Sequence, residues 1–294
     1  MAMTDDIAYY ATPGPMTRLD TLPDGALVGL PTDPTGIAEV VRGLVLHPFL
    51  AELYNVVVAE DHLDDVQIRP MGDVIGRLLD DDDRPLVEAR APEHRFSGNC
   101  RHFSTLTVAL LRHAGVPSRA RCGFGGYFQP GKWLDHWIVE HWDGERWVVL
   151  DAQIDRLQRE VFGLAADPAD LPPGHFLPAG EAWLACQAGI EDGDRFGILD
   201  EWGQWFIRGN VARDLAALNK VEMLPWDGWG DLATEDEPPG GDAYVDELAA
   251  LIGSGDHTAI RQRYETDDGL RVPPRVTAFF TRHGPTDVDV PELA

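Results

Sequence analysis

The sequence has little cysteine, little lysine and no long hydrophobic run. Its three cysteines are Cys100, Cys122 and Cys186. An odd, sparse set of this kind does not make a disulfide framework, and no Cys-x-x-Cys pair indicates a zinc site. No apolar stretch approaches the roughly 18 residues that a membrane-spanning helix needs, and the N-terminal residues do not resemble a signal peptide. We therefore expect a cytoplasmic protein with free thiols.

Positive charge is also scarce. Fifty acidic residues face 24 basic ones, which gives a net charge of −26, and only Lys132 and Lys220 are lysines. A negative field of this size repels phosphate backbones and anionic membrane surfaces, so we expect neither nucleic acid nor membrane as a partner. It mildly favours a neutral or cationic substrate. The shortage of lysine makes the chain a poor lysine donor for cross-linking itself.

Apolar periodicity and capping residues predict several helices outside the centre of the chain. These helices are expected at residues 37–46, 70–79, 179–189 and 210–220, the last with Asn210 as its N-cap. Residues 234–242, which are acidic and rich in proline and glycine, are the best candidate for a linker. We therefore expect a catalytic domain at 1–230, with its core motif region at 90–160, and a C-terminal helical extension at 231–294.

Cys100 opens the most informative helix. Phe103, Leu106 and Leu110 follow helical spacing, Gly115 is a stop signal, and capping chemistry is supplied by Ser97, Gly98 and Asn99. Free backbone N–H groups and the helix dipole stabilise a thiolate in the first turn, and the same groups can donate to an oxyanion. A buried structural cysteine is the alternative from the helix alone, and it is the interpretation we give to Cys122 and Cys186.

Three strand-like runs follow this helix, at residues 118–124, 135–142 and 146–151. Asp143-Gly144 is a favoured two-residue hairpin turn between the last two runs. With that loop Trp142 would pair with Glu145, and His136 would lie directly opposite Asp151, within hydrogen-bonding reach. A three-residue loop would instead set His136 opposite Ala152.

These residues predict a catalytic triad. Cys100 would be the nucleophile, His136 the base and Asp151 the residue that orients the histidine. The other histidines near Cys100 fit less well: His102 points away from Cys100 along the helix, and His141 lies on the opposite strand face. No pair of histidines has clean ligand spacing, so we expect no metal and no cofactor.

The central segment resembles the transglutaminase-like superfamily. Its helix ends as Arg112-His-Ala-Gly-Val-Pro-Ser-Arg119, a strand opens with His136-Trp137, and the next strand reads Gly144-Glu-Arg-Trp-Val-Val-Leu-Asp151. About 55 residues match the pattern of the superfamily in the right order. The calcium sites of animal cross-linking members and the zinc-binding cysteines of many N-glycanases are not evident.

The resemblance implies an α+β, papain-like core in which the nucleophile helix packs on an antiparallel sheet bearing histidine and aspartate, with helical extensions at both ends. It implies acyl transfer from a peptide or small-molecule amide or thioester. Hydrolysis is the leading expectation; an amide-forming acyltransferase of small-molecule biosynthesis and a non-catalytic binding module are the alternatives. Asn99 and the Cys100 backbone are candidate oxyanion donors, and Trp133 and Trp137 are candidate substrate contacts.

Overall fold

The computed structural model describes residues 5–230, 232, 238 and 240–293. The chain forms two compact units, one from residues 1–120 and 138–171 and the other from 121–137 and 172–294. It is an α+β protein in which helices accompany mostly antiparallel strand pairs. In the described part of the chain, every helix is too short or too polar to cross a membrane.

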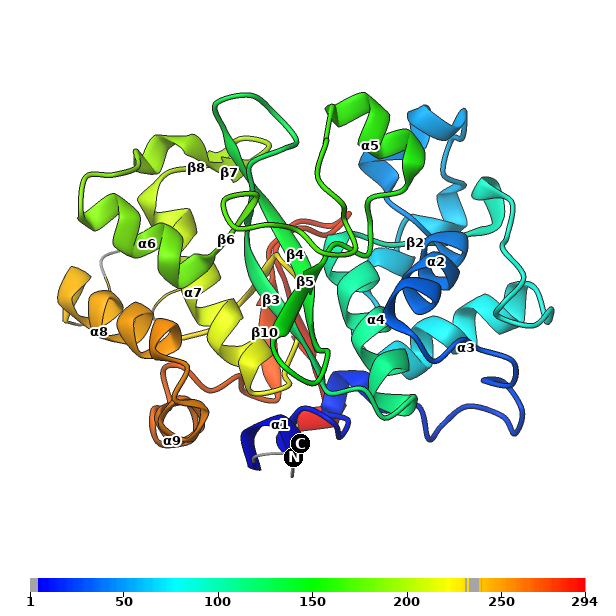
Figure 1. Ribbon diagram of the computed structural model, residues 1–294, viewed down its shortest axis with the longest axis horizontal. Helices are drawn as coiled ribbons and strands as arrows, with labels where there is room; N and C mark the ends of the chain where they lie inside the picture. Colours follow the sequence, from blue (N-terminus) through cyan, green and yellow to red (C-terminus); the bar gives the residue numbers. More distant parts are fainter. Residues whose placement is uncertain (1–4, 231, 233–237, 239, 294) are drawn as a thin grey trace. The chain divides into compact units, whose positions relative to one another are not determined.

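The first unit is built around helix α4 (Cys100–His113), whose residues from Cys100 to Arg112 are all buried. Helices α2 (Pro34–Leu44) and α3 (Met71–Asp81) contact α4 (Figure 1). The remaining elements of the unit are α1 (Asp5–Tyr9), α5 (Arg156–Phe162), the parallel strands β1 (Val45–Leu46) and β2 (Phe96–Ser97), and 3-10 helices at Pro15–Thr17, Pro48–Tyr54, Glu60–His62, Asp65–Gln67 and Pro92–His94.

The ends of these helices follow from local chemistry. The Asp33 carboxylate accepts the Gly36 N–H at 2.8 Å and caps α2, so the helix starts at Pro34, three residues before the predicted start. The helix ends two residues earlier than predicted because Val45 turns extended and pairs with Phe96. Helix α3 runs two residues beyond the predicted end, through Asp81, whose carboxylate pairs with Arg77 one turn earlier.

The hairpin between β4 (Trp133–Trp142) and β5 (Trp147–Leu150) corrects the predicted register. Trp142 pairs with Trp147 and Val139 with Leu150, so the loop has four residues rather than two. The Asp143 carboxylate causes the difference, because its Oδ1 accepts the N–H groups of Glu145 and Arg146, both at 2.8 Å. Continued by one residue, this pairing sets Asp151 opposite Ile138 rather than opposite His136. The shift is an even number of residues, so the side chains of each strand keep their predicted face.

In the second unit β3 (Ser118–Gly125) pairs with β6 (Phe176–Pro178), while β7 (Phe196–Ile198) pairs with β4 and with β8 (Glu201–Trp202). Helix α6 (Ala179–Gln187) contacts α7 (Gln204–Leu218) and α8 (Gly241–Ser254), and α9 (His257–Thr266) contacts α7 and α8 (Figure 1). A small antiparallel sheet contains β9 (Asp227–Gly228), β10 (Arg275–Ala278) and β11 (Thr286–Asp289), and 3-10 helices lie at Gly193–Arg195 and Pro291–Leu293.

The structure corrects the predicted start of α7. Helix α7 begins at Gln204, so Asn210 is a fully buried residue inside the helix and not its N-cap. The division of the chain also does not follow the predicted boundary at 230/231, because α8 and α9 pack on α6 and α7 within one unit. The predicted linker at 234–242 lies largely outside the described residues.

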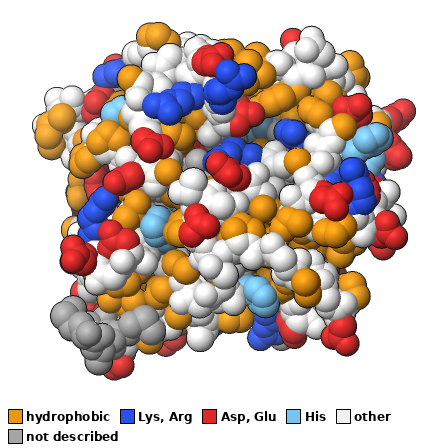
Figure 2. Space-filling model, turned by 45° about the vertical axis from the view of Figure 1, so that its right-hand side comes forward, with side chains coloured by type: hydrophobic (Ala, Val, Ile, Leu, Met, Phe, Trp, Pro, Cys, Tyr) orange, Lys and Arg blue, Asp and Glu red, His pale blue; other side chains and the backbone are white. Residues whose placement is uncertain are grey.

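The surface reflects the composition of the chain. Figure 2 shows acidic and basic side chains interspersed with hydrophobic groups over one face, with no large area of a single charge. The net charge of −26 is therefore not gathered into one patch on this face.

Candidate active site

Cys100 is the first residue of α4 and is buried, with 6% of its surface exposed. Asn99 is the N-cap, as the sequence predicted, and its Oδ1 accepts the His102 N–H at 3.3 Å. His102 completes a capping box, because its Nδ1 accepts the Asn99 N–H at 3.1 Å. This reciprocal bonding fixes the turn that carries the Cys100 thiol at the positive end of the helix dipole.

His102 is a structural residue of this turn. Its Nε2 lies 2.9 Å from the carbonyl oxygen of Ile68, so Nε2 donates while Nδ1 accepts from Asn99. The ring is fully buried, and burial together with the nearby Arg101 charge lowers its pKa well below the usual value. His102 is therefore held neutral, and its ring is used in the cap.

Asp151 follows β5 and is fully buried. Its Oδ1 accepts the N–H groups of Gln153 at 2.9 Å and Ile154 at 3.3 Å, and its own N–H donates to the carbonyl of Pro168 at 2.8 Å. Backbone groups of the following turn thus hold the carboxylate in one orientation.

His136 lies on the part of β4 that belongs to the second unit, and its ring is 2% exposed. Two aromatic rings contact it edge-on: Phe128, with ring centroids 4.8 Å apart, and Tyr127, at 6.1 Å. Sequence reasoning missed both residues. The sequence feature that could have indicated them is the glycine pair directly before them. A Cβ on Gly125 would lie 2.6 Å from the Phe128 ring, so this position needs a glycine.

The opposite face of β4 is anchored to α7. The Asn210 side chain donates to Asp135 Oδ1 at 2.8 Å and accepts from Arg213 at 3.0 Å. Burial raises the pKa of the Asp135 carboxyl. This network fixes the strand residue next to His136 and explains why Asn210 is buried in mid-helix.

The two tryptophans expected to contact substrate differ in exposure. Trp133 is partly exposed and stacks on Phe196, with ring centroids 5.9 Å apart and planes 4° from parallel. Trp137 is fully buried, so its indole has no surface for a substrate, and the expectation for this residue is corrected. Trp137 shows the alternation of the strand: His136 and its neighbour point to opposite faces.

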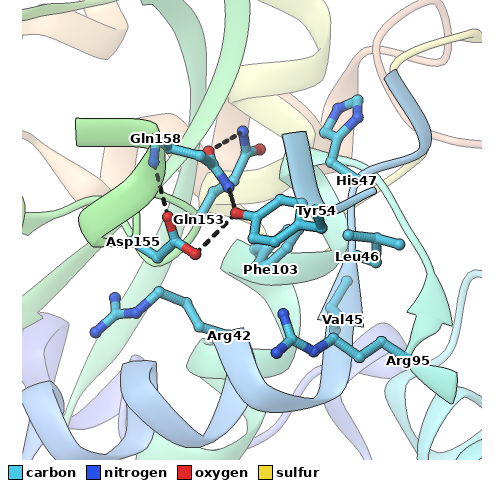
Figure 3. A pocket seen from close by; sticks show the side chains of 10 residues that line it. All are labelled: Arg42, Val45, Leu46, His47, Tyr54, Arg95, Phe103, Gln153, Asp155 and Gln158. Carbon is cyan, nitrogen blue, oxygen red and sulfur yellow. Dashed lines mark hydrogen bonds between the residues drawn. The ribbon is translucent and has the colours of Figure 1, made fainter. Parts of the chain in front are cut away.

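A pocket lies in the first unit beside α4. Figure 3 shows Tyr54 at its centre, between a polar group of three residues and two arginines. Its lining residues are Arg42, Val45, Leu46, His47, Tyr54, Arg95, Phe103, Gln153, Asp155 and Gln158. Phe103 lies one helical turn after Cys100, and Gln153 lies two residues after Asp151, so the pocket adjoins the segments that carry both residues. Sequence reasoning assigned no role to this group.

Within the ranges 5–230 and 240–293, no group of three His, Cys, Asp or Glu side chains is placed to hold a metal ion.

A comparison with known protein families confirms the resemblance of the central segment. Residues 81–152 match the family model of the transglutaminase-like superfamily, a match that includes Cys100, His136 and Asp151. The chain thus contains a segment that is similar to the transglutaminase-like core.

Among solved structures, the chain is similar to a candidate cysteine protease from Cytophaga hutchinsonii. The identity is 18%, the TM-score is 0.35, and the match covers 60% of this chain and 46% of the other. The aligned region thus spans less than half of that protein. A comparison with curated proteins gave no significant match.

Proposed function

We propose that the protein is a cysteine-nucleophile enzyme that hydrolyses an amide through an acyl-thioester intermediate, with Cys100, His136 and Asp151 as its triad. The observation that carries the proposal is the position of Cys100 as the first residue of α4, within the segment that matches the transglutaminase-like core. A thiol in that position loses its proton readily, because helix N–H groups and the dipole stabilise the thiolate.

The proposed reaction balances as an acyl transfer. The Cys100 thiolate attacks the amide carbonyl, a C–S bond forms, and the C–N bond breaks as the imidazolium of His136 gives its proton to the leaving amine. Water then attacks the thioester: a C–O bond forms, the C–S bond breaks, His136 takes up the proton of the water, and the carboxylic acid leaves as the Cys100 thiolate is restored. Asp151 holds the imidazole tautomer throughout.

Asn99 supports the proposal as an oxyanion donor. Its Oδ1 is engaged in the helix cap, while its buried Nδ2 has no hydrogen-bond partner among the described residues. A buried amide N–H₂ beside a nucleophile is costly unless a ligand oxygen accepts from it. The backbone N–H of Cys100 is the second proposed donor.

Thiol labelling tests the nucleophile directly. At pH 6.5, iodoacetamide should modify Cys100 at least about ten-fold faster than Cys122 or Cys186, as read by peptide mass spectrometry. Cys122 is fully buried, and burial together with the charges of Glu191 and Asp192 raises the pKa of Cys186 to about 11, so both serve as internal references. Equal, slow labelling of all three thiols would overturn the proposal and favour a binding module.

The base is tested by a matched pair of variants on one strand. His136→Gln should slow the labelling of Cys100, whereas His141→Gln, on the opposite face of β4, should leave it close to wild type. An amine acyltransferase would show itself with a thioester probe, because added amine would then release the acyl group faster than water does. Release by water alone supports hydrolysis.

A further inference from the structure

Arg42 and Arg95 line the pocket of the first unit, and neither guanidinium forms a direct ion pair with a carboxylate of the described residues, although the Asp155 carboxylate is near enough to attract both. Arg42 makes no hydrogen bond or ion pair with any residue that the structure describes. Arg95 donates its Nε to the carbonyl of Arg90 at 3.1 Å, and its guanidinium lies 5.9 Å from the centre of the Tyr54 ring. Burial lowers the pKa of both arginines, and the attraction of nearby carboxylates, among them Asp155, only partly offsets the loss of water.

The carboxylate of the pocket is already occupied. Asp155 Oδ1 accepts the Gln158 N–H at 2.8 Å as the N-cap of α5, and Oδ2 accepts the Tyr54 hydroxyl at 2.8 Å. Burial raises the pKa of the Tyr54 hydroxyl, so it remains a donor to Asp155. In Figure 3 the dashed lines connect the polar side chains on the other side of Tyr54, and none of them reaches Arg42 or Arg95.

The pocket also holds one buried acceptor with no donor. Gln158 donates its side-chain amide to the Tyr54 oxygen at 2.8 Å and accepts from Gln153 Nε2 at 3.3 Å. The last polar atom of this series of hydrogen bonds is Gln153 Oε1. It has no hydrogen-bond partner in the described residues, although Gln153 is only 3% exposed. A buried acceptor of this kind costs free energy until an N–H or O–H group of a ligand donates to it.

From this arrangement we infer that the pocket binds the carboxylate end of the substrate, with Arg42 and Arg95 holding the carboxylate and Gln153 accepting an adjacent amide N–H. A terminal carboxylate next to an amide N–H, as in a peptide C-terminus or an N-acyl amino acid, supplies both features. The inference rests on the proposed function, because Phe103 and Gln153 link the pocket to the Cys100 and Asp151 segments.

The charge of the lining narrows the class of ligand. Two guanidiniums against one carboxylate leave the lining with one net positive charge, which matches a carboxylate better than a doubly charged phosphate. The pocket thus selects an anion within a chain whose net charge is −26, the opposite of what the overall charge favours.

Calorimetric titration of the full-length Cys100→Ala protein tests the inference without turnover. The probes are N-acetyl-glycyl-glycine, its C-terminal carboxamide and inorganic phosphate. The carboxylate should bind about ten-fold more tightly than the carboxamide. Arg42→Met or Arg95→Met should abolish that preference, whichever of the two variants folds as wild type by circular dichroism.

Arg156→Met is the matched control. Arg156 lies on α5 with its side chain 92% exposed and outside the pocket lining, so its removal changes the net charge equally and should keep the preference. Equal binding of carboxylate and carboxamide, or a preference that survives in both arginine variants, would overturn the inference. So would phosphate binding as tightly as the carboxylate.

The two proposals fail separately. If the pocket prefers the carboxylate but Cys100 is labelled slowly, the carboxylate site is supported and the proposed enzyme is contradicted. If Cys100 is labelled fast but the pocket shows no preference for the carboxylate, the nucleophile is supported and the carboxylate site is contradicted.

Discussion

Arg121 in the second unit and Arg42 in the first unit differ in what surrounds their charge. In the second unit, Arg121 on β3 holds the Asp214 carboxylate of α7 through two bonds of 2.9 and 2.8 Å, and the Cys122 N–H adds a third at 3.0 Å. In the first unit, Arg42 has no partner of this kind among the described residues. A guanidinium that binds a carboxylate of the protein itself holds two elements together. A guanidinium without such a carboxylate is available to bind a ligand.

Asp214→Asn should produce the largest loss of stability. Asp214 is fully buried and Arg121 is 8% exposed, so the substitution leaves a buried cation without its counter-charge. We expect a loss of about 3–5 kcal/mol in the free energy of unfolding, measured by urea denaturation. Replacing both residues with apolar ones should recover much of that loss; a single variant within about 1 kcal/mol of wild type would show that the pair is not a structural clamp.

His102 extends the comparison to pH. Above about pH 6.5 the ring is neutral in the folded and unfolded chains, and its contribution to stability is fully present. Because burial lowers its folded pKa, only the unfolded chain binds the proton as the pH falls below that value. Stability should then fall by up to about 1.4 kcal/mol per pH unit from this group.

Denaturation curves for wild type and His102→Gln at pH 7.5 and pH 5.5 measure that effect. The variant should lose stability at both pH values, because the cap on Asn99 is weakened, but the difference between the two pH values should shrink. An unchanged pH dependence in the variant would assign the acid sensitivity to other groups.

Asp155→Ala tests the internal side of the pocket. The substitution removes both the N-cap of α5 and the acceptor of the Tyr54 hydroxyl. A loss of about 1–2 kcal/mol is expected in thermal or urea unfolding, since a cap and one buried hydrogen bond disappear together. Asp155→Asn keeps the cap, so it should cost less; equal losses in the two variants would contradict the role assigned to the cap.

Arg42→Met should have the smallest effect on stability. The side chain has no partner to lose among the described residues, and burial already disfavours its charge, so the free energy of unfolding should stay within about 1 kcal/mol of wild type. If Arg42→Met lost as much free energy of unfolding as Asp214→Asn, Arg42 would stabilise the fold as Arg121 does, and the difference between the two arginines would be contradicted.

The sequence predicted the elements around Cys100 well. The helix from Cys100, its Asn99 cap and the three following strands were readable because capping chemistry and periodicity act over a few residues. The hairpin register was wrong by two residues, because the Asp143 side chain bonds to two backbone N–H groups and lengthens the loop. The start of α7 was missed because its residues from Phe206 to Leu218 are all buried, which removes the polar face that marks a helix in a sequence.

Local sequence therefore determined the candidates for the proposed chemistry: a cysteine at a helix start, a histidine on one strand and an aspartate directly after the next strand, in a segment that matches the transglutaminase-like core. Tertiary structure decided which charged side chains have a partner within the protein and which do not. Asp214 reaches Arg121 from 93 positions away, and Tyr54 meets Asp155 across 101. Contacts of that separation depend on how whole elements pack, and no short-range pattern in the sequence encodes them.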